Sequence, residues 1–376
     1  MFLKNGINNY KSRFFYIRNM LRPSKYIIAP LSIAFFAYLS FTFRGLFTFS
    51  AFLYAYAMIP LLELLLKNDD RNLSEFEMNI EKNNRTYDVL LYLSVGIHLV
   101  LLAMFLTSVQ EPGLQIYELI GRILSMGLLT TFAINLGHEL GHRRNKGEQF
   151  LAKVMLLTSI MMHFFIEHNR GHHRNVATIE DPSTARKGET VYAFWFRAII
   201  NEYISAWRLE SKKRRSLNQY NLSLKNEMIQ FQFIQLAFVF IIFKFFGALV
   251  CVAFILNVIM AYLSFETVQY LEHYGLLREK DDKGHYKPVQ PYHSWNSNHV
   301  FGRLMMFNLS RHSDHHYRSS KKYQILNHHD DAPQLPTGYP GMMILSLLPP
   351  LWFRIMNPKL KALEAKRSKI IENQLS

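Results

Sequence analysis

The sequence has almost no cysteine: Cys251 is the only one among 376 residues, and it lies inside an apolar run. A single cysteine cannot form a disulfide within one chain, and it rules out CxxC pairs and zinc ribbons. It also rules out a built-in iron–sulfur carrier, whose irons are bound by several cysteines. Any metal or redox cofactor held by this chain would therefore be bound by histidine and carboxylate side chains.

The sequence is also poor in acidic residues. Asp and Glu number 28 against 43 Lys and Arg, which gives a net charge of +15, and 49% of the residues are hydrophobic. The hydrophobic residues form long blocks with charged segments between them, which is typical of membrane spans. Basic loops beside an acidic lipid surface would account for the charge, as would an acidic soluble partner. No nucleic-acid-binding motif accompanies it, so we expect no nucleic-acid partner.

Six of the apolar blocks are candidate transmembrane helices. Turns at Arg44, Glu111–Gly113 and Lys244 would join them into three hairpins, and Pro60 should kink the second span. The strongly basic segments fall on the side opposite these turns, which the positive-inside rule makes cytoplasmic. The sequence thus predicts an all-α integral membrane protein with six transmembrane helices. The predicted spans are residues 27–43, 47–66, 89–109, 116–136, 228–243 and 245–268.

The remaining segments complete the predicted organisation. Residues 1–26 carry six basic residues and no small-residue cleavage site, so we expect a retained cytoplasmic segment. Residues 27–358 would form the membrane domain and residues 359–376 a charged cytoplasmic tail. Leu151–Ile166 is apolar but too short to span, so we expect it to dip into the membrane face or to be buried. Met342–Phe353 should be interfacial or buried. We predict a multi-pass protein of the cell inner membrane.

Nine of the 16 histidines gather in four stretches, HELGH, EHNRGHH, EHYG and RHSDHH, at or beyond the cytoplasmic ends of the spans. His138 and His142 are four residues apart, so on a helix they share a face and can bind one ion. His172 and His173 are adjacent and point in different directions on a helix. They could therefore bind two different ions, or one of them could lie outside the ligand set and contact a ligand. Nine imidazoles fit two ions with four or five ligands each, and imidazole suits iron, copper, zinc and nickel. The candidate ligands are His138, His142, His168, His172, His173, His273, His312, His315 and His316.

Each stretch also carries a carboxylate beside a histidine. Metal-bound histidines usually donate their second ring N–H to such a group, which fixes the tautomer. We therefore expect these acids to orient the ligands or to transfer protons, while direct ligation, bridging and simple solvation stay open. His163, His293 and His299 lie close in sequence to the stretches and are candidates for a supporting role. The four acids are Glu139, Glu167, Glu272 and Asp314.

Two other functions share parts of this pattern. HELGH matches the HExxH signature of zinc metalloproteases, in which Glu139 would be the general base. Seven further clustered histidines would then have no purpose. A membrane metal transporter also places histidines on its helices, but its ligands should lie near the bilayer midplane. The nine clustered histidines all lie at or beyond the cytoplasmic ends of the predicted spans, so neither alternative accounts for the whole pattern.

HELGH, EHNRGHHRNVAT, LEHYGLLR, HSWNSNH and RHSDHH followed by LPTGYPGM together resemble the membrane alkane hydroxylases, or alkane 1-monooxygenases. These enzymes belong to a histidine-rich di-iron superfamily with xylene monooxygenase and the membrane fatty-acid desaturases. The histidine boxes mark the superfamily, whereas EHYG and HSWNSNH are more specific to the alkane hydroxylases. The resemblance covers Ile27 to Pro358, nearly the whole chain.

The resemblance implies a non-haem di-iron site with two iron ions in a cytoplasmic histidine-rich cap. It implies dioxygen as oxidant and hydroxylation of the terminal methyl of medium- or long-chain n-alkanes to 1-alcohols. Another hydroxylase, an epoxidase or a fatty-acyl desaturase of the same superfamily is the alternative enzyme. The resemblance also implies rubredoxin as electron donor, with rubredoxin reductase and NADH upstream. Candidates for docking this acidic carrier are Lys212–Arg215, Arg143, Arg144 and Lys321–Lys322.

The substrate would enter from the membrane lipid through an apolar channel. The resemblance suggests that the second span lines this channel, with Tyr54, Ala55 and Ala57 as candidate lining residues. If Ala55 faces inward, the channel is open at that point and longer alkanes should fit. Small residues that let helices pack closely are an equally open explanation of the two alanines.

Overall fold

The structure is a computed structural model that describes residues 22–375, with side chains described as far as residue 367. Within this range the chain forms helices and loops, and two isolated β-bridges occur in place of strands. The prediction of an all-α fold is therefore confirmed. Most of the cytoplasmic segment predicted for residues 1–26 lies outside the described residues.

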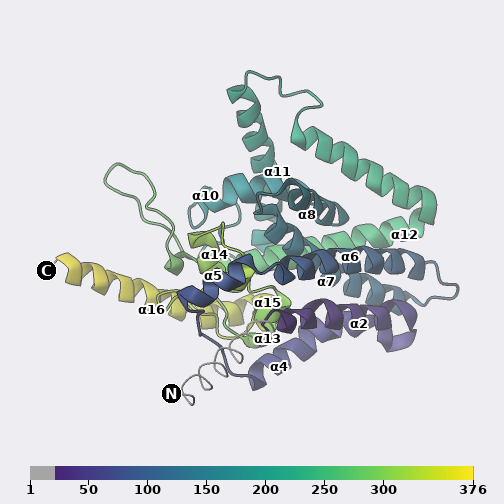
Figure 1. Ribbon diagram of the computed structural model, residues 1–376, viewed down its shortest axis with the longest axis horizontal. Coiled ribbons are helices and arrows are strands. Elements are labelled where there is room, and N and C mark those ends of the chain that lie inside the picture. Colours follow the sequence, from purple (N-terminus) through teal and green to yellow (C-terminus); the bar gives the residue numbers. More distant parts are fainter. Residues whose placement is uncertain (1–21, 376) are drawn as a thin grey trace, which may run out of the picture.

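Five helical segments in the described range are long and apolar enough to cross a membrane. The first four agree with predicted spans to within five residues at either end. The fifth, α12, covers both remaining spans, because its two arms are joined at Gly247 with φ 83° and ψ 177°, a conformation open to glycine. Figure 1 shows α12 folding sharply back on itself. The six-span topology stays a prediction. The segments are Pro23–Thr42 with α2 (Ile28–Thr42), Gly45–Leu65, α6 (Thr86–Ser108), α7 (Ile116–Gly141) and α12 (Glu227–His273).

The second segment contains a π-turn directly before Pro60. Between α3 (Ser50–Leu53) and α4 (Ile59–Leu65), the residues Tyr54–Met58 form η3, in which the N–H of Ile59 bonds to the carbonyl of Tyr54. Proline lacks an N–H and its ring crowds the preceding turn, so the helix widens at this point. The predicted kink takes the form of this π-turn. It leaves Tyr54 and Ala55 buried, whereas Ala57 lies on the exposed face.

Helix α7 lies at the centre of the bundle and packs against α2, α6, α8 (Lys146–Thr158) and α12. Two of its glycines allow the close approach of neighbouring helices. A Cβ on Gly127 would lie 2.6 Å from Cγ of Met260 on α12, and one on Gly137 would lie 3.0 Å from Cγ of Leu156 on α8. The tight packing holds the C-terminal end of α7, which carries HELGH, in one position.

Short helices and loops form a cap at the end of α7 and α12 (Figure 1). Leu151–Ile166 is not one segment: α8 ends at Thr158, and Ile160 has a positive φ of 54° before α9 begins. Most of the apolar side chains of this stretch are buried, whereas the alternative expectation was that the stretch dips into the membrane face. Met342–Phe353 is divided between α15 (Tyr339–Ser346) and α16 (Pro349–Leu375).

The remaining helices are short pieces of the cap and the connections between the longer helices, apart from α11. They are η1 (Pro23–Ile27), η2 (Gly45–Phe49), α5 (Glu75–Asn83), α9 (Phe164–Glu167), η4 (His168–His172), α10 (His173–Asn175), α11 (Val191–Ser216), η5 (Pro291–His293), α13 (Val300–Met305), α14 (His312–Tyr317) and η6 (Tyr323–Ile325).

Glu63, a buried carboxylate on α4, joins the second membrane segment to the cap. Its Oε1 accepts a hydrogen bond of 3.1 Å from the backbone N–H of Gly302 on α13. Its carboxylate also occupies the space that a Cβ on Gly338 would need. Gly338 therefore has to be glycine because the Glu63 carboxylate lies against its backbone.

Replacing Gly338 by alanine should destabilise the protein by about 1–3 kcal/mol, the usual cost of overpacking a filled site. The melting temperature of the detergent-solubilised protein measures this. Gly96→Ala is the matched control, because a Cβ there meets nothing within 4 Å. In the double variant Gly338→Ala with Glu63→Ala, the loss of stability should be smaller than the sum of the losses in the two single variants. The reason is that Glu63→Ala removes the atoms that the new Cβ meets. Equal melting temperatures for Gly338→Ala and Gly96→Ala would contradict this interpretation.

Candidate metal centre

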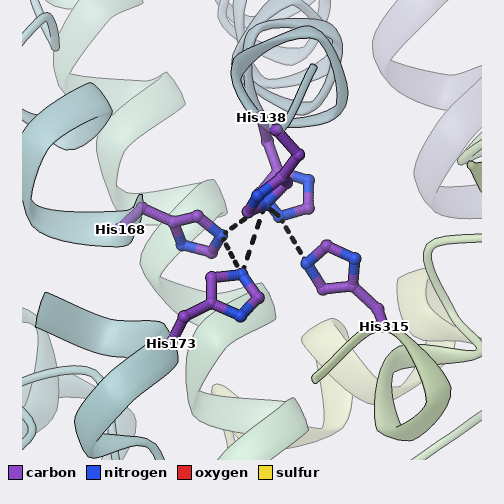
Figure 2. A group of neighbouring side chains, drawn as sticks. His138, His168, His173 and His315 are labelled. Atoms are coloured by element: carbon purple, nitrogen blue, oxygen red, sulfur yellow. Dashed lines mark hydrogen bonds between the residues drawn. The ribbon is translucent and has the colours of Figure 1, made fainter. Parts of the chain in front are cut away.

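The structure brings the nine predicted histidines together in two groups. Within each group the candidate ligand atoms all lie within 4.8 Å of one another. Figure 2 shows rings from the first group converging on one point from separate helices. His138 comes from α7, His168 from η4 and His315 from α14. The five-histidine group is His138, His142, His168, His173 and His315, and the four-histidine group is His172, His273, His312 and His316.

A π-turn decides how EHNRGHH is divided between the groups. In an α-helix His168 and His172, four apart, would share a face. The stretch instead forms the π-helix η4, in which residues five apart approach each other. His168 and His173 therefore share the five-histidine group, with their Nε2 atoms 3.0 Å apart, and His172 joins the other group. The adjacent histidines serve different groups, which was one of the two expected possibilities.

The geometry of both groups fits a shared cation. In each close pair the two atoms that face each other are Nε2 nitrogens, at 2.9–3.2 Å. Two nitrogens bound at about 2.1 Å to one ion, at a right angle to each other, lie about 3.0 Å apart. A neutral Nε2 either donates or accepts, so several such close contacts to one Nε2 do not form an ordinary hydrogen-bond network. The two groups could each hold a metal ion.

Burial keeps the rings in the form that binds metal. It lowers the pKa of His142 to about 3, with help from the neighbouring His172 and Arg143. It also lowers the pKa of His168 and His315 well below the ordinary value, because a charged imidazolium would lose its hydration and face other histidines. These three imidazoles are thus neutral at physiological pH, as metal binding requires.

Asp181 is a site residue that the sequence did not reveal. Its Oδ2 and Oδ1 lie 3.0 and 3.2 Å from Nδ1 of His172, and it also accepts a hydrogen bond from Thr184. Burial opposes its charge, but the bonds to His172 and Thr184 still hold its pKa below the ordinary value. Among the described residues, this carboxylate is the one that bonds to the second ring nitrogen of a grouped histidine. Its position in the loop after EHNRGHH gave no spacing signal.

The four carboxylates singled out from the sequence have other partners. Glu139 accepts from Arg143 at 2.6 Å, so it is not free to act as the base of a protease. Glu167 accepts from Ser205, and Asp314 accepts from Lys321 and His329. Glu272 reaches the centre itself: its Oε2 lies 3.2 Å from Nε2 of His312, and its Oε1 accepts from the hydroxyl of Tyr339 at 3.0 Å. Their roles in orienting ligands or moving protons stay predictions.

The other histidines in question lie outside both groups. The ring of His163 packs against Tyr203, Nδ1 of His293 accepts from the N–H of Gln290, and His299 bonds to Ser297. Both groups lie at the ends of α7 and α12 rather than at their middles, which does not suit a transport site at the bilayer midplane.

Several of the basic residues proposed for docking are already paired. Arg143 and Lys322 both contact Asp88, and Lys321 contacts Asp314. Arg214 is buried and donates to backbone carbonyls. Arg144 is exposed and lies two residues after His142. His142 and His173 are the two grouped histidines that are partly exposed.

An apolar cavity of 120 Å³ lies between α2, η3, α7, α12 and the cap. Tyr54 and Ala55 line it, as the sequence suggested, but Ala57 does not. Residues two apart point to nearly opposite sides of a helix, so Ala57 lies on the outer face when Ala55 faces inward. The inner end of the cavity is marked by Asn135, one turn before His138, and by Tyr339, which bonds to Glu272. Two lining residues thus relate the cavity to the histidine groups, the first through α7 and the second through Glu272, whose Oε2 lies 3.2 Å from Nε2 of His312.

Comparisons with known proteins agree with this site. The family model described as fatty acid desaturase matches residues 118–345, which include all nine grouped histidines. The chain thus has the helices and the histidine site of that broad class of membrane proteins. The hydroxylase component of the Pseudomonas putida xylene/toluene monooxygenase is 26% identical over 73% of this chain and 74% of its own length.

More similar relatives narrow the class. Alkane 1-monooxygenase 1 of Alcanivorax borkumensis is 39% identical over 80% of this chain and 74% of its own length. The alkane 1-monooxygenase of Pseudomonas putida is 38% identical over 81% of this chain and 76% of its own length. The chain belongs to the alkane 1-monooxygenase family, which confirms the resemblance found in the sequence.

Proposed function

We propose that the protein is a membrane di-iron monooxygenase that converts medium- or long-chain n-alkanes to 1-alcohols. The observation that carries the proposal is an apolar cavity whose lining residues Asn135 and Tyr339 adjoin two groups of histidines: Asn135 lies one turn before His138, and Tyr339 bonds to Glu272. Relatives that are 38–39% identical over 80–81% of the chain are alkane 1-monooxygenases. Of the alternatives, another hydroxylase, an epoxidase or a desaturase would use the same kind of centre and differ in product.

The metal ions are proposed to be two irons, one held by each histidine group. Imidazole nitrogen suits iron, and with no grouped thiolate a copper(I) or structural zinc site is disfavoured. Iron in such a site supplies the reductive activation of dioxygen, the chemistry that an alkane C–H bond needs. The overall reaction takes one dioxygen, two electrons and two protons; one oxygen atom enters the terminal C–H bond and the other leaves as water.

The residues of the cavity would bind and orient the hydrocarbon. An alkane has no polar group, so its position is set by the shape of the apolar wall alone. A chain that enters end-on past Tyr54 and Ala55 presents its terminal methyl at the inner end, between Asn135 and Tyr339. The hydrogen bond from Tyr339 to Glu272 keeps that carboxylate fixed at the same end. The packed wall excludes water from the reacting carbon.

Electrons are proposed to come from rubredoxin, with rubredoxin reductase and NADH upstream. The partly exposed edges of His142 and His173 are where a carrier can approach the centre most closely, and Arg144 is an exposed cation beside them. Because Arg143, Lys321 and Lys322 are paired with carboxylates, we place the docking site around Arg144. The site and both termini would then lie on the cytoplasmic face of the inner membrane.

A product assay tests the proposed function. Purified protein with NADH, rubredoxin reductase, rubredoxin and n-dodecane should give the primary alcohol, identified by gas chromatography with mass spectrometry. Elemental analysis of the same sample should find iron rather than zinc. A desaturated acyl product without alcohol would assign the chain to the desaturase branch instead, and a zinc-loaded protein without any oxygenation would contradict the proposal.

Replacing Ala55 by phenylalanine should shorten the range of alkanes that the enzyme accepts. The side chain lines the cavity and is 7% exposed, so a phenyl ring would block the path of a long chain. We expect turnover of long alkanes to fall several-fold while the shortest substrates are retained. Ala57→Phe, two residues along on the exposed face, is the matched control. If both variants keep the wild-type chain-length profile, the cavity is not the substrate site.

A further inference from the structure

A polar pocket of 180 Å³ lies in the cap, and we call it the basic pocket. It is formed by η1, the loop after α4, α5, α13, the loop before α14, and η6, and α13 packs against η1 and the start of α2 (Figure 1). Five of its lining side chains are cations and two are carboxylates. The cations are Arg22, Lys25, Arg71, Arg303 and Arg311, and the carboxylates are Asp69 and Glu77.

The two lining carboxylates are already bound by part of this positive charge. Asp69 accepts from Arg71 at 2.7 Å, and this bond lowers the pKa of the Asp69 carboxyl to about 2. Glu77 accepts from Arg22, and Glu81, behind the pocket wall, lies 3.6 Å from the same guanidinium. Even when Glu81 is counted, the cations of the pocket outnumber the carboxylates by two.

Arg311 is a buried cation that forms no ion pair with any residue that the structure describes. It is 3% exposed, and it donates to neutral oxygens, among them the backbone carbonyls of Asp69, Arg71 and Leu326. Its buried Nε has no hydrogen-bond partner in the described range. Arg303, 7% exposed, lies 3.9 Å from the carboxylate of Asp69. Burying a charge is costly unless a counter-charge accompanies it, so this wall favours an added anion.

Lys25 is the second cation of the pocket without an ion pair in the described chain. Its ammonium lies over the ring of Tyr26, 5.1 Å from the centroid, and the residue is exposed. Residues 1–21 contain no Asp or Glu, so their side chains cannot supply the missing negative charge. An anion in the pocket would therefore meet an ammonium and a guanidinium that have no carboxylate of their own.

The chemistry of the basic pocket suits a phosphate group. The planar guanidinium matches phosphate oxygens, and the lysine ammonium adds a compact charge. The pocket also lies at the start of the first membrane segment, where Ile27, Ile28 and Leu31 are 36–53% exposed. Basic pockets beside membrane helices bind anionic lipid headgroups, whose acyl chains would here lie along the exposed side of α2.

We propose that the basic pocket binds a phosphate group, for which an anionic phospholipid of the bilayer and free inorganic phosphate are the two sources. Its position at the start of a membrane segment favours the lipid. The pocket shares no lining residue with the apolar cavity, and no grouped histidine lines it. The inference is thus independent of the proposed function and can fail or hold without it.

A binding experiment on the purified full-length protein in a neutral detergent tests the proposal. Dioctanoyl phosphatidylglycerol, sodium phosphate and dioctanoylglycerol are titrated separately at constant ionic strength, and the melting temperature is followed. Phosphatidylglycerol should raise the melting temperature, whereas dioctanoylglycerol, with the same acyl chains and no phosphate, should not. Lys25→Gln should weaken the binding about fivefold, the contribution of one cation beside an anionic headgroup.

Lys82→Gln is the matched control, because it removes the same charge from an exposed residue of α5 that does not line the pocket. It should bind phosphatidylglycerol as the wild type does. A response to sodium phosphate that depends on Lys25, without one to phosphatidylglycerol, would support the phosphate site and assign it to a soluble anion. The proposal would be overturned by the absence of both responses, by an equal response to dioctanoylglycerol, or by equal weakening in Lys25→Gln and Lys82→Gln.

Discussion

Replacing His315 by alanine should abolish alkane hydroxylation and lower bound iron from about two per chain to at most one. His315 is 1% exposed and its Nε2 lies 3.0 Å from that of His138, so it supplies one of the five nitrogens of its group. Loss of a residue that only supports a ligand typically costs about 10–100-fold in metal affinity or activity, and loss of a ligand itself should cost more. Elemental analysis and the alcohol assay on one preparation measure both effects.

His293→Ala is the matched control for this experiment. His293 is buried to the same degree, at 2% exposed, but its ring serves the backbone of Gln290 and lies outside both groups. It should keep its iron even if it loses some stability. A His315→Ala protein that retains two irons and full activity would remove His315 from the centre. Similar iron loss in both variants would show that general destabilisation, not ligation, releases the metal.

Changing Asp181 to asparagine should weaken metal binding or activity by about 10–100-fold, the range seen for groups that orient a ligand from behind. The carboxylate accepts from Nδ1 of His172 at 3.0 Å and so fixes the tautomer that turns Nε2 toward the centre. An amide keeps the size of the side chain but removes the charge that strengthens this bond. Iron retained during dialysis against a chelator measures the effect separately from turnover.

Asp314→Asn is the comparison for Asp181→Asn, because it makes the same change beside a grouped histidine. Asp314 bonds to Lys321 and His329 instead of to a ring of the centre. We expect it to release iron more slowly than Asp181→Asn. If Asp314→Asn loses iron as fast, the carboxylates act through the general stability of the cap, and the special role of Asp181 is contradicted.

The candidate ligands could be predicted from the sequence because they depend on local spacing. His138 and His142 lie four apart at the end of one apolar run, and α7 carries this run to Gly141 without interruption. Their assignment to groups could not be predicted, because it depends on the π-turn in η4. The residue types in EHNRGHH do not distinguish a π-turn from a regular α-helical turn. The partnership of Asp181 with His172 depends on how a loop folds back, which spacing does not record.

The membrane segments show the same division. The length of an apolar run and the charged residues at its ends are local properties of the sequence. They predicted the positions of four candidate membrane helices. The turn predicted at Lys244 and the nearby Gly247 lies at Gly247, whose positive φ of 83° redirects α12. Of the candidate channel residues, Tyr54 and Ala55 line the apolar cavity and Ala57 lies on the exposed face, and their role in substrate passage stays a prediction.

The π-turn in η4 also determines how far apart the two groups are. His172 and His173 are consecutive and belong to different groups, and their ring centroids lie 5.9 Å apart. The backbone link between the two residues therefore keeps the two groups next to each other. Deleting one residue between His168 and His172 would restore an α-helical register, and the two binding sites would compete for the same histidines instead of standing side by side.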